Sequence, residues 1–370
     1  MATPNGSFRV IRASISTMSV KFSEPGTTAL GEDGALHLSL GRMGLQDGGV
    51  VNDAVIVVNT FGRLNSSRDN AVVIPTSFGA SHRDFEWMVG ADSLFDPARY
   101  FIVIANLFGN GLSSSPSNSP VFTVGERYPL VTAYDNALAQ KYVLERFFGV
   151  RRIAVAMGWS MGGQVAWHLA SLFPEDVERL VAVCATAKTS AHNLVFLEGA
   201  KAVLQTDAAY DPESGRFTSK PKRALRALGR FYAGWALSQA FYRDECWRSL
   251  GYNDLEEFLI GYWESAFVEK NADDLLSHIA TWMAADIAAN ERHRGDLTKA
   301  IEAVQARALL LPVRSDLYFR ETDVRAEAAY LEDVRTVTLD SPWGHRAGNP
   351  LNSPSDRNFI RTQLRNFTMD

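Results

Sequence analysis

The chain has 370 residues, of which 46% are hydrophobic and 21% are charged, as in ordinary globular proteins. This composition excludes a chain that is mainly disordered. Thirty-seven Lys and Arg residues stand against 42 Asp and Glu residues, which gives a net charge of −5. Because nucleic-acid-binding domains are usually basic, we expect no nucleic-acid partner.

The cysteines and the apolar segments indicate the cell compartment in which the protein is expected. Cys184 and Cys246 lie far apart in sequence, which is the spacing of neither a disulfide framework nor a zinc site. No apolar run approaches the ~20 residues that a membrane-spanning helix needs. We therefore expect a cytoplasmic protein with no membrane partner. Residues 1–23 contain basic residues and serines but no acid, so a mitochondrial transit segment is the alternative to an irregular N-terminal arm.

Short apolar segments alternate with helix-length segments through the first half of the chain. The expected strands are residues 54–58, 71–74, 100–105, 153–157 and 180–184, and the expected helices are 131–148 and 163–173. Buried parallel strands are continuously apolar because helices cover both faces of their sheet. The alternation predicts an α/β fold with a mostly parallel sheet and helices on both faces.

The alternation stops at about residue 187. Helical periodicity follows, with no clear strand, over residues 190–204, 222–242, 254–268 and 273–290, and a turn-rich segment at 211–215 separates two of these helices. Strand-like runs resume at 308–313 and 336–339, and a final amphipathic helix covers 356–367. We predict a helical subdomain, residues 187–300, inserted between a first part of the core, residues 1–186, and a second part, residues 301–370.

The strongest local pattern is Gly158-Trp159-Ser160-Met161-Gly162, between an expected strand and an expected helix. In this context Gly-x-Ser-x-Gly predicts a nucleophile elbow, a tight turn that tolerates only glycine on either side of the serine. The turn exposes the serine hydroxyl beside a helix N-terminus, where negative charge is stabilised. We predict that Ser160 is a nucleophile; the alternative is an unreactive glycine-rich turn.

A serine hydroxyl reacts only when a base removes its proton. Of the seven histidines, His345 alone lies in a loop after the last expected strand, where α/β sheets carry functional groups. The others precede Ser160, follow it directly on its own helix, or lie in the helical insert. His345 is therefore the predicted base, and an exposed loop histidine is the alternative.

The acid of such a triad is expected between the serine and the histidine, just after a strand of the resumed sheet. Asp316 occupies that position. Asp323 lies in the next expected helix, and Asp340 is too close to His345 in sequence to reach its Nδ1 easily. We predict that Asp316 holds the imidazole tautomer and stabilises the imidazolium.

Backbone N–H groups must stabilise the oxyanion that forms during acyl transfer. We predict that one donor is Met161, the residue after the nucleophile, and that the other is Ser77, in the loop after the expected strand 71–74. Thr76 and Phe78, the residues directly before and after Ser77, are the alternatives.

The residues around these groups indicate a snug pocket, with a place in the hydrophobic core as the alternative for each aromatic residue. Phe78, Trp159 and Trp343 are aromatic residues of the elbow and the two loops, and we expect the first two to contact the substrate. The sequence contains no His-x-x-x-His or Cys-x-x-Cys pair. We therefore expect no catalytic metal.

Several segments between Val55 and Arg346 match one known family. They are VNTFGRLN at 58–65 with RDNAV at 68–72, DPARYFIVI at 96–104, WSMGGQ at 159–164, KNADDL at 270–275 and SPWGH at 341–345. Together they resemble the homoserine O-acetyltransferase family of the α/β-hydrolase superfamily. The resemblance implies an α/β-hydrolase fold, a lid formed by the helical insert, and a homodimer assembled through that lid.

The departures from the family pattern concern the substrate. Where the acyltransferases of the family carry an aspartate that takes the homoserine amine, this chain has Arg346. Lys201 aligns with a family arginine near the pocket floor, so the resemblance implies that both residues contact substrate. The loop 107–116 resembles that of the esterase-like branch. Because a cation beside the histidine repels an ammonium group, we do not expect homoserine as substrate.

The sequence thus predicts a serine esterase that cleaves a short-chain acyl ester, a small molecule, through an acyl-Ser160 intermediate without a cofactor. The alternative is an O-acyltransferase that uses acetyl-CoA as donor and a hydroxyl compound other than homoserine as acceptor. A third hypothesis is an unreactive α/β-hydrolase scaffold that binds a partner, which the complete triad disfavours.

Overall fold

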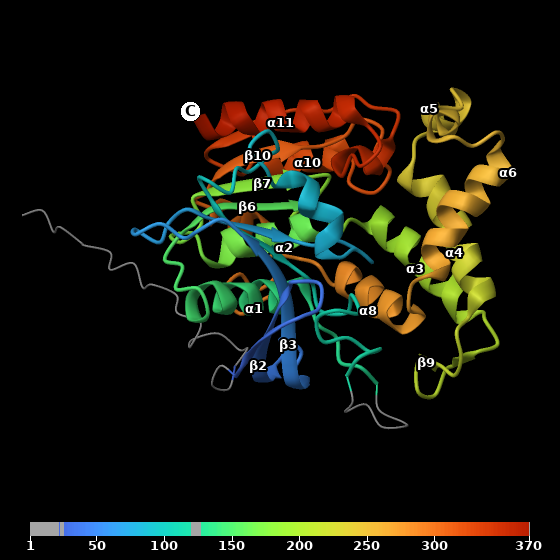
Figure 1. Cartoon of the computed structure of the whole chain (residues 1–370), viewed down its shortest axis with the longest axis horizontal. Helices are drawn as coiled ribbons and strands as arrows, with labels where there is room; N and C mark the ends of the chain where they lie inside the picture. The colour runs from blue at the N-terminus through green and yellow to red at the C-terminus, as the bar shows by residue number, and fades with distance from the viewer. Residues whose placement is uncertain (1–21, 23–25, 120–126, 370) are drawn as a thin grey trace, which may run out of the picture.

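The computed structural model describes residue 22 and residues 26–119 and 127–369. A single nine-stranded sheet runs through the molecule in the order β1-β2-β3-β5-β4-β6-β7-β10-β11 (Figure 1). The transit segment or arm expected over residues 1–23 lies outside the described residues, apart from Phe22.

One edge of the sheet is antiparallel and the rest is parallel. The antiparallel part consists of β1 (Thr28–Leu30), β2 (Leu36–Gly44) and β3 (Val50–Phe61), and β3 pairs antiparallel with β5. The parallel part comprises β5 (Phe101–Ala105), β4 (Ala71–Pro75), β6 (Ile153–Trp159), β7 (Arg179–Val183), β10 (Arg307–Leu311) and β11 (Val334–Thr336). Every residue of β4, β5 and β6 is buried. The predicted α/β fold with a mostly parallel sheet is therefore confirmed.

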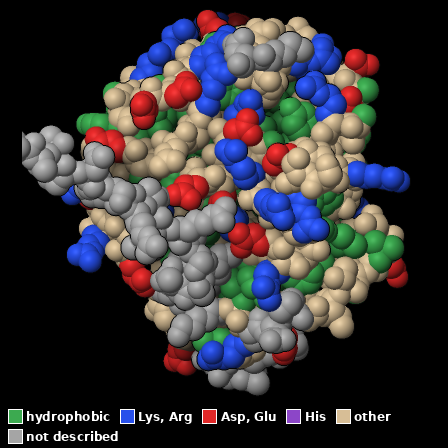
Figure 2. All heavy atoms as spheres, turned by 90° about the vertical axis from the view of Figure 1, so that its left-hand side faces the viewer, with side chains coloured by type: hydrophobic (Ala, Val, Ile, Leu, Met, Phe, Trp, Pro, Cys, Tyr) green, Lys and Arg blue, Asp and Glu red, His purple; other side chains and the backbone are tan. Residues whose placement is uncertain are grey.

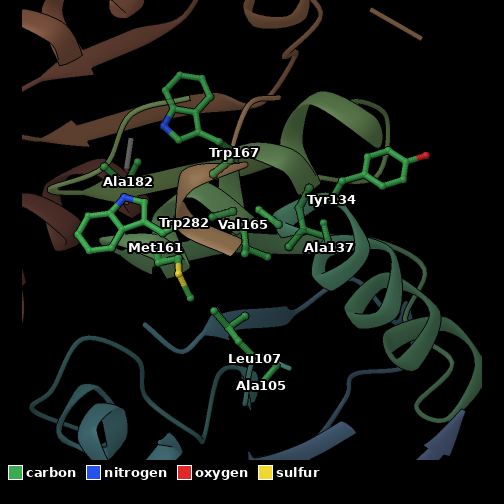
Figure 3. Close-up of a cluster of buried hydrophobic side chains, with 14 of the residues drawn as sticks. Ala105, Leu107, Tyr134, Ala137, Met161, Val165, Trp167, Ala182 and Trp282 are labelled. Carbon is green, nitrogen blue, oxygen red and sulfur yellow. The ribbon is translucent and has the colours of Figure 1, made fainter. Parts of the chain in front are cut away.

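Helices cover both faces of the sheet. On one face α1 (Ala133–Arg146) and α2 (Met161–Leu172) pack on the strands, and Figure 3 shows Met161, Val165 and Trp167 of α2 within this core. On the other face the 3₁₀ helix η2 (His82–Met88) and α11 (Pro354–Met369) close a second core. α10 (Glu321–Ala328) precedes β11. Burial on both faces explains why the strands show no polar alternation.

The chain between β7 and β10 is mostly helical. It contains α3 (Ala191–Gln205), α4 (Lys222–Ala236), α5 (Gln239–Arg243), η3 (Cys246–Leu250), α6 (Leu255–Phe258), the π-helical turn η4 (Leu259–Glu264), α7 (Ser265–Val268), α8 (Ala272–Met283) and α9 (Leu297–Glu302). Helices α3 to α6 gather at one end of the sheet, on the right of Figure 1. This stretch also holds a hairpin that we did not expect, formed by β8 (Tyr210–Asp211) and β9 (Arg216–Phe217). Strands of two residues are too short to show a periodic pattern.

The surface carries both signs of charge. On the face shown in Figure 2, Lys and Arg side chains are interspersed with Asp and Glu side chains. Among the described residues, every helix is too short or too polar to span a lipid bilayer.

Candidate active site

Ser160 lies at the tight junction between β6 and α2. Its φ of 58° and ψ of −130° are strained values for a residue with a side chain. A Cβ at position 158 would lie 2.2 Å from the carbonyl of Gly162, and a Cβ at position 162 would lie 2.3 Å from the Pro75 carbonyl oxygen. The packing therefore admits only glycine at both positions, as the elbow pattern predicts.

His345 and Asp316 form a buried hydrogen-bonded pair. His345 lies on the short helix η5 (Gly344–Gly348), and its Nδ1 lies 2.8 Å from Asp316 Oδ2. The other carboxylate oxygen accepts the N–H groups of Tyr318 at 2.8 Å and Phe319 at 3.3 Å. Only 5% of the histidine side chain and none of the aspartate side chain is exposed. With Nδ1–H donating to the carboxylate, Nε2 is left to accept a proton from another group.

Aromatic rings fix the orientation of the imidazole. Trp159 stacks on it with ring centroids 5.0 Å apart, and Tyr318 meets it edge-on at 4.8 Å. The Trp159 indole N–H also donates to the backbone carbonyl of His345 at 3.1 Å. The residue before the nucleophile thus holds the histidine loop in place.

Ser160 and His345 line the same cavity, which has a volume of about 260 Å³. Eight of its lining residues are aromatic: Phe78, Trp159, Tyr232, Tyr262, Trp263, Phe267, Trp282 and Tyr318. Five of these eight belong to the helical stretch between β7 and β10. A cavity of this size and lining suits a small, largely apolar ligand.

The loop after β4 offers backbone donors at the cavity. The N–H of Thr76 donates to a carbonyl of β5 at 2.9 Å, and the N–H of Gly79 donates to a histidine ring on α8 at 3.0 Å. Ser77 and Phe78 lie between them and line the cavity. Met161 is the first residue of α2, where an N–H has no acceptor within the helix. Ser77 and Met161 therefore stay the predicted donors, with Phe78 as the alternative, whereas the Thr76 N–H is already used.

Two side chains of the helical stretch hold this loop from outside. Lys270 Nζ donates to the Gly79 carbonyl at 2.6 Å, and His278 Nδ1 accepts the Gly79 N–H. The other ring nitrogen of His278 lies 3.1 Å from the Phe108 carbonyl. Burial lowers the pKa of His278 to about 4, so the ring is neutral near pH 7 and can accept. No local pattern in the sequence predicts this clamp, because its partners are almost 200 residues apart.

The structure brings three of the four predicted substrate contacts to this cavity. Phe78, Trp159 and Arg346 line it. Lys201 does not: it lies on α3 beside a separate cavity of about 250 Å³, with its Nζ 3.4 Å from Glu198. Alignment along a helix does not determine which way a side chain faces, and the structure places Lys201 away from Ser160.

Cys184 is a neighbour of the pair that we did not predict. It follows β7, is fully buried, and its sulfur lies within 4.8 Å of the Asp316 carboxylate and the His345 ring. Burial raises the pKa of this thiol, and the Asp316 charge adds to the rise. Within the described part of the chain, Cys184, Asp316 and His345 form the one group of three possible metal ligands, with ligand atoms within 4.8 Å of one another. The absence of a metal stays a prediction.

Comparison with known proteins agrees with this geometry. Residues 70–345 match the alpha/beta hydrolase fold family. A Corynebacterium glutamicum protein named "Probable esterase" is 30% identical over 83% of this chain and 88% of its own length. A homoserine O-succinyltransferase of Cupriavidus metallidurans is 29% identical over 82% of this chain and 85% of its own. The solved structure of an acetylester hydrolase from Corynebacterium glutamicum is 28% identical and covers 91% of this chain and 96% of its own, with a TM-score of 0.86.

The packing at the elbow can be tested by substituting glycine. We expect Gly162→Ala to lower the free energy of unfolding by about 3 kcal/mol or more, because its Cβ would overlap backbone carbonyls. Gly234→Ala is the matched control, since nothing lies within 4 Å of a Cβ there and the position is on α4. It should raise the stability by up to about 1 kcal/mol. Equal urea unfolding curves for the two variants would contradict the packing argument.

Proposed function

Because this chain belongs to the α/β-hydrolase family, we propose that it is a serine esterase that hydrolyses short-chain acyl esters through an acyl-Ser160 intermediate. The observation that carries this proposal is the His345–Asp316 hydrogen bond beside the cavity that Ser160 lines. The acetylester hydrolase and the esterase relative support a short acyl group and hydrolysis.

In the first half-reaction, Ser160 Oγ attacks the ester carbonyl carbon and its proton passes to His345 Nε2. The Asp316 carboxylate stabilises the resulting imidazolium, and the N–H groups of Met161 and Ser77 bind the oxyanion. The bond between the carbonyl carbon and the alcohol oxygen then breaks. The leaving oxygen takes the proton from His345, and the alcohol departs.

In the second half-reaction, water replaces the alcohol. His345 takes a proton from the water as its oxygen attacks the acyl carbon, and then returns that proton to Ser160 Oγ. The products are the carboxylic acid and the free enzyme, so the cycle consumes one ester and one water. No step requires a metal or an organic cofactor.

A second candidate is acyl transfer. The same acyl-Ser160 can form from acetyl-CoA and react with a hydroxyl compound in place of water, and the homoserine O-succinyltransferase relative favours this possibility. Arg346 lines the cavity and would repel the ammonium group of homoserine. The acceptor would therefore be a hydroxyl compound of another kind.

We further propose that residues 187–300 form a lid over the core made by residues 1–186 and 301–370, and that the lid assembles a homodimer. The lining of the cavity by Tyr232, Trp263 and Trp282 supports the first part. Exposed apolar side chains on the lid, Val195 at 67% and Ile260 at 50%, support the second. Light scattering should give twice the mass of the chain; the mass of one chain would contradict the dimer.

Substitution of the nucleophile tests the esterase proposal. We expect Ser160→Ala to lower the rate of p-nitrophenyl acetate hydrolysis by about 10⁴-fold or more, since the variant lacks the hydroxyl that forms the proposed acyl intermediate. Ser249→Ala, at an exposed serine whose Oγ donates to a backbone carbonyl, should retain the wild-type rate. If the protein hydrolyses no ester but releases CoA from acetyl-CoA when an alcohol is added, the esterase proposal is wrong and the acyltransferase proposal takes its place.

The thiol at position 184 should affect the pH dependence. Without the thiol dipole beside it, the Asp316 carboxylate stabilises the imidazolium more strongly. We therefore expect Cys184→Ala to move the rising limb of kcat/KM about half a pH unit toward higher pH. Cys184→Ser, which keeps a donor, should follow the wild-type profile more closely. Superimposable profiles for the alanine variant and the wild type would show that the thiol does not act on the triad.

A further inference from the structure

Three charged side chains besides the proposed triad line the cavity: Asp84, Lys270 and Arg346. Two of them are already bound within the protein. Asp84 Oδ2 accepts the backbone N–H of Ser81 at 2.8 Å, and Lys270 Nζ donates to the Gly79 carbonyl. Each of these two side chains is therefore held in place by a bond to a backbone group.

Arg346 differs from these two. It is half-buried, and its guanidinium carbon lies 5.3 Å from the Trp159 ring centroid. Within the described residues, its guanidinium has no carboxylate and no hydrogen-bond acceptor as partner. Stacking on a ring satisfies the face of a guanidinium but leaves its N–H edge available. Because Trp159 also stacks on His345, this edge is held close to the reacting groups.

The polar atoms of some lining residues are buried behind the cavity surface. Four lining side chains have buried polar atoms without a hydrogen-bond partner within the described residues: the Tyr232 and Tyr318 hydroxyls and the Trp263 and Trp282 indole nitrogens. Each of these residues is more than nine-tenths buried. Indole nitrogens only donate, and phenol hydroxyls can donate. Burial raises the pKa of the Tyr318 phenol, and the nearby Arg346 charge opposes that rise.

A guanidinium that lines the cavity without a carboxylate partner calls for a ligand that brings negative charge. We propose that the substrate is a short-chain acyl ester whose alcohol portion carries a carboxylate, which Arg346 binds. The inference rests on the proposed esterase function. A planar carboxylate matches the guanidinium edge and fits a cavity of about 260 Å³. The acetylester hydrolase structure favours an uncharged acetyl group, so we assign the carboxylate to the alcohol portion.

The test compares 4-acetoxybenzoate with its methyl ester, which lacks the negative charge. We expect the wild type to hydrolyse the carboxylate with a kcat/KM at least about tenfold higher. In Arg346→Gln this ratio should fall to within about threefold of unity. Arg243→Gln is the matched control, because Arg243 lies on α5, pairs with Asp244 and is 73% exposed. This control should keep the wild-type ratio.

Equal hydrolysis of the two esters by the wild type, or an unchanged ratio in Arg346→Gln, would overturn the inference and leave the esterase proposal intact. Phenyl hydrogen succinate carries its carboxylate on the acyl portion, and methyl phenyl succinate is its uncharged counterpart. If the wild type prefers the charged compound only in this second pair, the assignment of the carboxylate to the alcohol portion is wrong.

If neither acetoxybenzoate is hydrolysed, the esterase proposal fails, and binding decides the inference separately. Calorimetry with Ser160→Ala should then show 4-acetoxybenzoate binding at least about tenfold more tightly than its methyl ester. Addition of Arg346→Gln should remove that difference. Equal affinities for the two compounds would overturn the inference.

Discussion

The close packing of Gly162 against the backbone of the loop after β4 fixes the position of the elbow relative to that loop. Gly162, at the start of α2, lies so near the carbonyls of Pro75 and Thr76 that no Cβ fits between them. This contact joins the elbow that presents Ser160 to the loop that carries Ser77. The proposed nucleophile and the proposed oxyanion donors are therefore held at one distance by the backbone itself, without dependence on flexible side chains. The strained φ of Ser160 is maintained by the same packing.

The core and the helical stretch contribute different residues to the site around this junction. The core supplies Ser160, Asp316 and His345, and the adjacency of β7 and β10 places Cys184 against Asp316. The helical stretch supplies most of the aromatic wall and, through Lys270 and His278, holds Gly79 at the end of the donor loop. The catalytic residues that we propose thus come from the core, whereas the cavity wall is shared between the core and the helical stretch.

The sequence was informative wherever a local pattern had one structural outcome. Continuous apolar runs identified the parallel strands, and the Gly-x-Ser-x-Gly context identified the elbow. The remaining features depend on contacts between distant segments. The helix expected over 222–242 breaks where Leu237 is extended and Ser238 caps α5, and the one expected over 273–290 ends at Met283. No local pattern predicts the direction in which Lys201 points, the contact of Cys184 with Asp316 or the clamp on Gly79. Each of these features depends on the segments that pack against it.

Mass spectrometry after a rapid acid quench with p-nitrophenyl acetate tests the proposed triad most directly. Nitrophenolate is a good leaving group, so acylation should outrun deacylation and the intermediate should accumulate. We expect one acetyl group per chain, on the peptide that contains Ser160, and none in His345→Ala within the same time. Acetate release with the acetyl group on another residue, or with no acetylated protein at any time, would contradict a nucleophilic Ser160.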